Sequence, residues 1–273
     1  MMNTESSEKS YSKIREPKRE GYPPITPEHI ADSLIHLGIK VEDYIVDVMD
    51  YRKYFDDARY KEDFPDYYPA NLPEKSLEHY LAAQFLNLKD SDIYIDIASQ
   101  HSPVPIIYSR LYGAKAFRQD LDYPSGLQGD TIGGDAANMP IPDEFATKMG
   151  LHCSFEHFEG DSDIRFIHEA ARVLKPGGVV CIAPLYMADE YSIVTDSVVA
   201  LTQNIRFENN AVVCCVKGYN NRHGRFYDPK HIERRIVKNL GDLIFKLIRV
   251  TNVKQIDQSC YLEFVGIIEK PSD

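Results

Sequence analysis

Between residues 93 and 185 the chain alternates short apolar runs with amphipathic segments, and this alternation limits the fold more than any other feature. Helical patterns fall at 104–112 and 162–174. The apolar runs lie before, between and after them, at 93–98, 114–119, 131–134, 150–155 and 179–185. Strands joined by helical crossovers form a mostly parallel sheet with helices on both faces. We therefore predict an α/β fold.

The segments outside this region complete the expected organisation. Two strand-like runs at 245–250 and 261–268 are too close for a helical crossover, so they should form an antiparallel pair at the C-terminal edge of the sheet. Residues 1–20 hold almost nothing to bury, and we expect a disordered arm there. Residues 21–72 should form a helical N-terminal cap, and residues 73–273 the α/β domain.

Charge and composition exclude several classes of protein. Asp and Glu total 42 against 31 Lys and Arg, and the formal charge of −11 disfavours a nucleic-acid partner. The longest apolar run, at 179–187, is roughly half of what crosses a bilayer, so we expect no membrane span. The N-terminus shows no hydrophobic secretory segment, and the five cysteines are odd in number and form no C-x-x-C pair. We expect a cytoplasmic protein without a disulfide framework.

Each of the first three predicted strands has an acidic residue in it or at its end: Asp96 lies inside the first, Asp120 closes the second and Asp135 follows the third. In an open α/β sheet the ligand lies beyond the carboxyl ends of the strands, where Asp96, Asp120 and Asp135 are expected. A carboxylate such as that of Asp120 can accept hydrogen bonds from both hydroxyls of a ribose. Asp135 with Ala136 would place a carboxylate and a backbone N–H near an adenine ring. Together these residues predict an adenosine site, although Asp120 and Asp135 as solvated turn residues are the alternative.

The order of these parts resembles the cofactor half of class I S-adenosylmethionine-dependent methyltransferases. The resemblance covers roughly residues 90–187, in the segments Asp96-Ile97-Ala98, 113–120 (GAKAFRQD), 134–140 (GDAANMP), 152–158 (HCSFEHF) and 169–178 (EAARVLKPGG). It implies a Rossmann-like sheet of seven strands, S-adenosyl-L-methionine as the cofactor, and methyl transfer as the activity. It also implies that Asp96, Asp120, Asp135, Ala136 and His152 lie beside the cofactor.

The loop after the first strand departs from the family pattern D/E-x-G-x-G-x-G. Ala98, Gln100 and Ser102 stand where the three glycines would be. Glycine there permits a positive φ and a close approach of the backbone to the cofactor. Because the strand-end acids are kept, we expect the loop to bind the cofactor, with the side chains of Ser99, Gln100 and Ser102 replacing some backbone contacts. The alternative is a catalytically silent relative that serves as a binding or assembly protein.

The segment that follows the fourth predicted strand offers the candidate catalytic residues. We predict His157 as a general base, because imidazole accepts protons well near neutral pH, and Glu156 as the residue that orients it. The alternative is that His157 only packs the turn. His152, Glu156 and His157 are close to the zinc motif H-x-x-E-H. Their spacing is one residue longer than in the motif, however, and they are expected on a strand and not on a helix, so we predict no metal.

Candidate acceptor contacts lie further along the chain. Tyr186 ends the fifth strand, and Arg222 and Arg225 belong to a basic loop that could clamp an anionic acceptor. A packed aromatic residue and an ordinary solvated loop are the alternatives. The tyrosine-rich stretch 44–68 is either a lid over the substrate or a set of packed helices.

These observations give an expected function. We predict methyl transfer to a small-molecule acceptor, at a hydroxyl of a sugar, a lipid precursor or a secondary metabolite. No N/D-P-P-Y motif is present, which argues against the branch of the family that methylates amino groups of nucleic acids. A nicotinamide-dependent oxidoreductase would need the G-x-G-x-x-G fingerprint, which is also absent.

Overall fold

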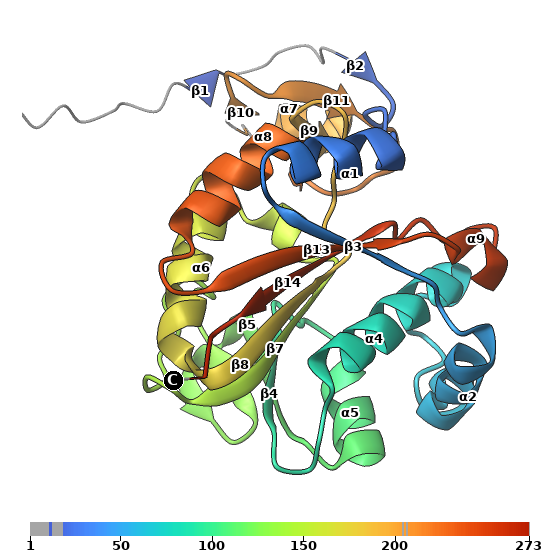
Figure 1. Ribbon diagram of the computed structural model, residues 1–273, viewed down its shortest axis with the longest axis vertical. Helices are drawn as coiled ribbons and strands as arrows, with labels where there is room; N and C mark the ends of the chain where they lie inside the picture. The colour runs from blue at the N-terminus through green and yellow to red at the C-terminus, as the bar shows by residue number, and fades with distance from the viewer. Residues whose placement is uncertain (1–10, 13–18, 204, 206, 273) are drawn as a thin grey trace, which may run out of the picture.

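A computed structural model describes residues 11–12, 19–203, 205 and 207–272. Its main sheet has eight strands in the order β3-β13-β14-β8-β7-β4-β5-β6 (Figure 1). The strands are β3 (Lys40–Tyr44), β4 (Ile93–Ile97), β5 (Lys115–Gln128), β6 (Thr131–Gly133), β7 (Ala146–His152), β8 (Leu174–Ala183), β13 (Ile244–Val250) and β14 (Phe264–Glu269). Strands β5, β4, β7 and β8 run parallel, and β14 is antiparallel to both of its neighbours. The predicted α/β class and the antiparallel C-terminal pair are therefore confirmed.

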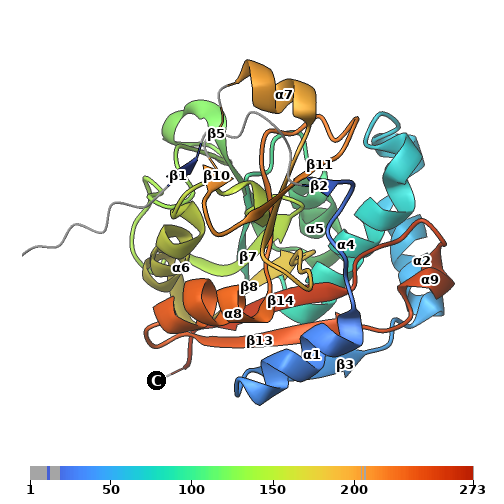
Figure 2. The same ribbon diagram turned by 90° about the horizontal axis from the view of Figure 1, so that it is seen from above.

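The strand count differs from the expected seven because β3 extends the sheet. β3 pairs in parallel with β13, and Arg249 holds Asp43 through two hydrogen bonds of 2.8 and 2.7 Å. Figure 2 shows α1 (Pro27–His36) and β3 beside β13. The segment 21–72 is therefore not a separate helical cap, because part of it belongs to the main sheet. The five residues of β3 carry three charges, so they lack the apolar alternation that predicts a strand.

Helices cover both faces of the sheet, and each face has its own apolar core. α1, α6 (Ser162–Val173) and the helical segment that starts with α8 (Pro229–His231) pack on one face. The opposite face packs against α2 (Val48–Ala58), α4 (Leu72–Leu86) and α5 (Val104–Tyr112). The shorter helical elements are α3 (Tyr60–Asp63), η1 (Pro69–Asn71), η2 (Phe155–His157), α7 (Ser197–Thr202), η3 (Ile232–Ile236), η4 (Val237–Asn239) and α9 (Val253–Ile256). Within the described part of the chain, no helix combines the length and apolarity needed to cross a membrane.

A second, four-stranded sheet lies at the top of Figure 1 in the order β12-β9-β11-β2. It is made of β2 (Arg19–Glu20), β9 (Ser192–Thr195), β11 (Val212–Cys215) and β12 (Gly224–Phe226), and β1 (Tyr11–Ser12) pairs nearby with β10 (Phe207–Glu208). Most of the predicted disordered arm lies outside the described residues, and the parts that are described form β1 and β2. This layer therefore combines segments from both ends of the chain.

The fourth predicted strand is shifted, which matters for the site. β7 starts at Ala146 and ends at His152, because Cys153 takes a positive φ of 46° that breaks the extended backbone. Glu156 and His157 consequently lie on the 3-10 turn η2 after the strand. The predicted helix at 104–112 matches α5, and the predicted helix at 162–174 matches α6 to within one residue.

Candidate active site

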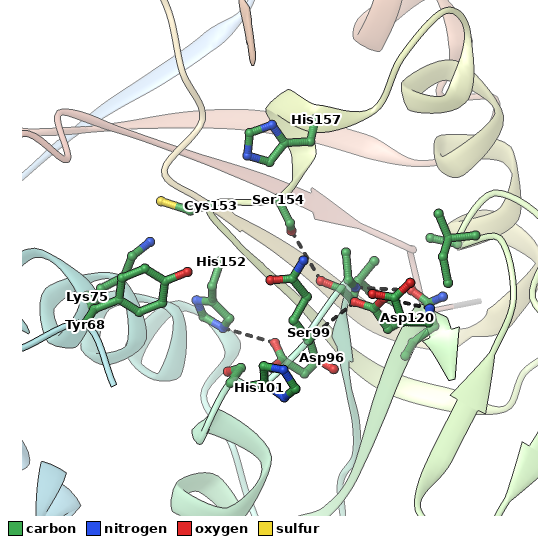
Figure 3. A pocket seen from close by; sticks show the side chains of 18 of the residues that line it. Tyr68, Lys75, Asp96, Ser99, His101, Asp120, His152, Cys153, Ser154 and His157 are labelled. Carbon is green, nitrogen blue, oxygen red and sulfur yellow. Dashed lines mark hydrogen bonds and ion pairs between the residues drawn. The ribbon is translucent and has the colours of Figure 1, made fainter. Parts of the chain in front are cut away.

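A cavity of about 1100 Å³ opens at the carboxyl ends of β4 and β7 and beside residues 119–122 in the middle of β5 (Figure 3). This volume exceeds the roughly 300–1,000 Å³ of common small-molecule sites. Every residue predicted to bind the cofactor lines it, namely Asp96, Ala98, Ser99, Gln100, Ser102, Asp120, Asp135, Ala136 and His152. We call the part formed by residues 98–102, Asp120, Asp135 and Ala136 the strand-end half. The part formed by Tyr67, Tyr68, Lys75 and Cys153 is the α4 half.

The loop after β4 keeps a glycine-type backbone without glycine. Ala98 has a φ of 52° and Gln100 a φ of 43°, both in the left-handed region that costs an L-residue about 1–2 kcal/mol. Three hydrogen bonds hold the loop to Gln119 and Asp120, inside β5: Ser99 N–H to the Gln119 carbonyl at 2.9 Å, Ala98 N–H to Gln119 Oε1 at 3.2 Å, and Gln100 N–H to Asp120 Oδ2 at 2.9 Å. The substituted residues therefore follow a path that glycine normally provides.

Asp120 organises this loop as well as bordering the cavity. Its Oδ2 accepts the Gln100 N–H, and its Oδ1 accepts the N–H of Asp122 at 3.0 Å. Each carboxylate oxygen has a second lone pair that a ligand hydroxyl could use. The Tyr123 hydroxyl donates to the Gln100 carbonyl at 2.5 Å and lies 3.2 Å from Ser99 Oγ, so a tyrosine covers part of the loop.

Asp135 stands at the open side of the strand-end half. Its Oδ1 accepts the Ala137 N–H at 2.9 Å, and its Oδ2 pairs with Arg165 of α6 at 3.0 Å. Ala136 beside it is buried. Two contacts therefore hold the Asp135 carboxylate in place, and Ala136 lines the cavity next to it.

Asp96 and His152 lie between the two halves and carry unsatisfied polar atoms. Asp96 Oδ1 accepts the Tyr94 hydroxyl at 3.1 Å and lies 3.7 Å from His152 Nε2, whereas Asp96 Oδ2 and His152 Nδ1 have no hydrogen-bond partner among the described residues. Burial raises the pKa of Asp96 to about 7 and lowers the pKa of His152 to about 3. Gly150 makes room for this arrangement, since a Cβ there would lie 2.3 Å from the Tyr94 hydroxyl. Buried polar atoms left without a partner beside a cavity indicate places for ligand groups.

His157 reaches the cavity with a defined tautomer. Its Nδ1 is hydrogen-bonded to the His223 carbonyl, and because a carbonyl only accepts, Nδ1 carries the proton. In the neutral ring Nε2 is then unprotonated, and it lies 3.6 Å from Glu156 Oε1. Glu156 is itself buried, which raises the pKa of its carboxyl, and His223 Nδ1 donates to the Glu156 carbonyl at 3.0 Å. His157 lines the cavity, and Glu156 stands behind it.

The three predicted acceptor residues do not line this cavity. Arg225 is fully buried and donates to the carbonyls of Phe158 and Gly160, at 2.7 and 2.9 Å, while it pairs with Asp163 and Glu208, both at 2.9 Å. The predicted clamp role of Arg225 is therefore wrong, because its donors are already used inside the protein.

Arg222 and Tyr186 are placed around the cavity rather than in it. Arg222 pairs at 2.6 Å with Glu159, and it is Glu159 that lines the cavity. The Tyr186 hydroxyl lies 3.4 Å from Cys153 Sγ, and its ring stacks on Tyr261 with centroids 6.4 Å apart. Each of them therefore contacts a residue that lines the cavity, Glu159 for Arg222 and Cys153 for Tyr186.

Sequence reasoning missed the polar residues of α4. Four ionisable residues of this helix, Glu74, Lys75, Glu78 and His79, are all buried. Lys75 Nζ lies 3.2 and 3.3 Å from the two oxygens of Glu78, and the Cys153 thiol donates to Glu78 Oε1 at 3.0 Å. Burial raises the pKa of Glu78 to about 7 and that of Glu74 to about 8. The available signal was a group of charges inside a helix whose remaining residues are apolar on every side.

The tyrosine-rich stretch divides between the two roles considered for it. Tyr67 and Tyr68 line the cavity. Tyr51, Tyr54 and Tyr60 are buried against α4 and α5 in the apolar core. The stretch is therefore partly cavity wall and partly helix packing.

Glu78, His79 and His152 approach one another closely enough to be considered as metal ligands. One ligand atom of each lies within 4.8 Å of the others. Both ring nitrogens of His79 are already hydrogen-bonded, to Tyr60 at 2.7 Å and to Tyr67 at 3.2 Å, and Glu78 has Lys75 as its cation. We therefore describe the cluster as a hydrogen-bonded wall and assign no metal to it.

Comparisons with known proteins identify a matching family and similar folds. The family described as "Methyltransferase domain" matches residues 110–182, and no curated protein matches the sequence. The Burkholderia thailandensis 1,6-didemethyltoxoflavin-N1-methyltransferase, solved with 1,6-didemethyltoxoflavin and S-adenosylhomocysteine, is 10% identical over 99% of each chain, with a TM-score of 0.51. At this identity the likeness establishes the fold.

Two further solved structures are more distant. SAM-dependent methyltransferases from Methanosarcina mazei are 13% identical, over 68% of this chain and 95% of theirs, with a TM-score of 0.44. The [4+2]-cyclase SpnF is also 13% identical, over 71% of this chain and 80% of its own, with a TM-score of 0.43. Neither adds to the argument below.

Proposed function

We propose that the chain is a class I S-adenosylmethionine-dependent methyltransferase that transfers a methyl group to a hydroxyl of a small molecule such as a sugar, a lipid precursor or a secondary metabolite. The match of residues 110–182 to a methyltransferase domain supports this proposal. The observation that carries this proposal is the glycine-type backbone at Ala98 and Gln100, beside a cavity edged by strand-end acids. A strained backbone at non-glycine residues persists where the surroundings hold it, and such strain collects at ligand sites.

The residues of the cavity fit the cofactor. Asp120 would accept the ribose hydroxyls, Asp135 and Ala136 would contact the adenine, and the unpaired oxygen of Asp96 would accept the ammonium of the amino-acid end. S-adenosylhomocysteine bound to the Burkholderia structure supports the same choice of cofactor. When bound, S-adenosylmethionine supplies an electrophilic methyl group, which an oxygen lone pair of the acceptor displaces from the sulfonium.

His157 would remove the proton that the acceptor hydroxyl loses. Its Nε2 is the unprotonated nitrogen, because Nδ1 is held by the His223 carbonyl. Glu156, 3.6 Å away, would stabilise the imidazolium that results. The buried walls of the cavity would align the acceptor, and alignment by itself supplies a large part of the rate in such displacements.

One observation favours a second function, that of a silent binding or assembly protein. Both oxygens of Asp120 already accept backbone N–H groups, and the Tyr123 hydroxyl covers the Gln100 carbonyl. A loop closed by its own contacts would have no use for a cofactor. Binding of S-adenosylhomocysteine separates the two functions.

Titration calorimetry with S-adenosylhomocysteine tests the proposal. The unaltered protein should bind it, and Asp120→Ala should weaken binding by about tenfold or more, since about 1.4 kcal/mol corresponds to a factor of ten. Asp130→Ala is the matched control, because Asp130 is an exposed acid that pairs with Arg118 away from the cavity. No binding at millimolar ligand would favour the silent protein, and equal binding by Asp120→Ala would refute the ribose assignment.

The same preparations test His157. His157→Gln should bind S-adenosylhomocysteine normally, and methyl transfer to hydroxylated acceptors should fall by about 100-fold or more. An unchanged rate would show that His157 only packs the turn η2.

We also propose a cytoplasmic location. All five cysteines are free, which fits a reducing compartment. The formal charge of −11 supports a small molecule rather than a nucleic acid as the partner.

A further inference from the structure

The α4 half of the cavity has a chemistry that the cofactor does not need. In Figure 3, Lys75 and Tyr68 lie on the opposite side of Asp96 and His152 from Asp120. The adenosine and the amino-acid end would occupy the region from Asp120 to Asp96. The volume of about 1100 Å³ leaves room for a second ligand next to Lys75.

Lys75 is a buried cation that lines this space. Its side chain is only 9% exposed, and its ammonium contacts both oxygens of Glu78. An ammonium donates three hydrogen bonds, so the carboxylate leaves one for another acceptor. Burial raises the pKa of Glu78, which weakens the negative charge that faces Lys75. This part of the cavity therefore favours an anionic group.

Aromatic side chains surround the same cation. Lys75 Nζ lies 5.3 Å from the centroid of the Tyr68 ring, and Tyr67 and Tyr68 meet edge to face with centroids 5.0 Å apart. Phe158 and His157 line the cavity from the side of η2. Flat apolar walls of this kind suit a planar ring, which packs against aromatic faces and edges.

We propose that the acceptor is a hydroxylated aromatic carboxylate, an inference that rests on the proposed function. Its carboxylate pairs with Lys75, its ring lies against Tyr67 and Tyr68, and its hydroxyl is directed toward His157. On methylation the O–H bond breaks and its proton moves to His157 Nε2. A new O–CH₃ bond forms as the C–S bond of the sulfonium breaks, and the carbon–sulfur electron pair stays on sulfur.

The shared chemistry at Lys75 is a carboxylate, and two ligands could bring one. The first is the aromatic acceptor, which we propose, and the second is the amino-acid end of the cofactor. Calorimetry with two probes, 4-hydroxybenzoate and the uncharged 4-hydroxybenzamide, separates them. The titrations use the unaltered protein saturated with S-adenosylhomocysteine, together with Lys75→Gln and Lys75→Arg.

We expect the unaltered protein to prefer hydroxybenzoate over hydroxybenzamide by about tenfold or more. Lys75→Gln should abolish this preference, and Lys75→Arg should keep part of it, because guanidinium also pairs with carboxylates. The affinity for S-adenosylhomocysteine should stay within about threefold in every variant. Lys115→Gln, an exposed lysine near the start of β5, is the matched control and should leave both affinities unchanged.

Several results would overturn the inference. A protein that binds S-adenosylhomocysteine but shows no preference between the probes, or a preference that survives Lys75→Gln, refutes the acceptor class alone. Loss of S-adenosylhomocysteine affinity in Lys75→Gln would assign Lys75 to the cofactor instead. If the unaltered protein binds no S-adenosylhomocysteine, the proposed function fails first. Should Lys75→Gln fold poorly, the double variant Lys75→Gln/Glu78→Gln removes both charges and gives the same comparison.

Discussion

The strand-end half of the cavity takes its polar groups from neighbouring strands and the residues that follow them, whereas the α4 half takes them from a helix, a loop and a turn. In the first, Asp120 and Asp135 each accept a nearby backbone N–H. In the second, Glu78 contacts both Lys75 and Cys153, and all three lie among other buried polar side chains, including His79 and His152. Hydrogen bonds from nearby backbone N–H groups hold a carboxylate in place with few other contacts. A buried cluster of polar side chains, by contrast, depends on the packing of the whole surrounding fold. We therefore expect substitutions near the two halves to differ in size and in pH dependence.

The largest change in the free energy of unfolding should come from the buried ion pairs of Arg225, which also binds the carbonyls of Phe158 and Gly160 just after the turn η2. Arg225→Met removes one of the two arginines that pair with the buried Asp163, a cation beside Glu208 and the donor to the Phe158 carbonyl, and we expect it to lower the free energy of unfolding by about 3–5 kcal/mol. Urea unfolding measures this change. Arg222→Met, just before β12 and at the surface, should lower it by less than about 1 kcal/mol. Similar small losses in both variants would contradict a supporting role for Arg225.

A smaller change in the free energy of unfolding, with a defined pH dependence, is expected on substitution of Asp96, whose carboxylate has no hydrogen bond from a backbone N–H among the described residues. Its pKa is about 7 in the folded protein and about 3.9 in an unfolded chain, so its favourable contribution is complete below pH 4 and is lost as the pH rises to 7. Asp96→Asn removes this penalty and should raise the free energy of unfolding at pH 8 by about 2–4 kcal/mol, with little change near pH 4.

Urea unfolding at both pH values checks this expectation. Asp130→Asn, at an exposed carboxylate, should change stability little at either pH. A gain from Asp96→Asn that is equal at pH 4 and pH 8 would show that its cause is not the charge.

The smallest effect concerns the strained loop of the strand-end half. Ala98→Gly should stabilise the protein by up to about 1 kcal/mol, because glycine adopts the φ of 52° freely but loses more entropy on folding. Gly113→Ala is the opposite change, at a φ of 75°, where a Cβ would also meet Asp90 Cβ at 3.0 Å, and it should cost about 1 kcal/mol. Thermal unfolding compares the two. Destabilisation by Ala98→Gly would mean that the alanine methyl group contributes packing that outweighs the strain.

The strand-end half could be predicted from sequence because its parts follow one another along the chain. Asp96 lies near the end of one apolar run, Asp120 and Asp135 directly follow the next two, and parallel strands bring such positions to one edge. The positive φ at Ala98 and Gln100 lay beyond prediction, since neither residue type favours it. It results from hydrogen bonds to Gln119 and Asp120 of the neighbouring strand.

The α4 half could not be predicted because long-range packing creates it. Nothing in the local pattern around Lys75 shows that its charge is covered by Tyr68 and by the end of β7. Arg225 illustrates the converse: a basic residue in a polar loop suggests exposure, yet four acceptors from distant segments surround it. Strand β3 was missed for a related reason, since its edge position tolerates charged residues that hide the strand pattern.

The position of β14 in the main sheet has a consequence for how the molecule assembles. Although residues 264–269 come after every other strand in the sequence, they lie between β13 and β8, in the middle of the strand order. During synthesis the sheet therefore remains in two pieces, with β3 and β13 separated from β8, β7, β4, β5 and β6. Each piece presents an open edge that could pair with another chain. Shortening the chain to before residue 264 would leave both edges exposed, so such a fragment should aggregate rather than form a smaller version of the fold.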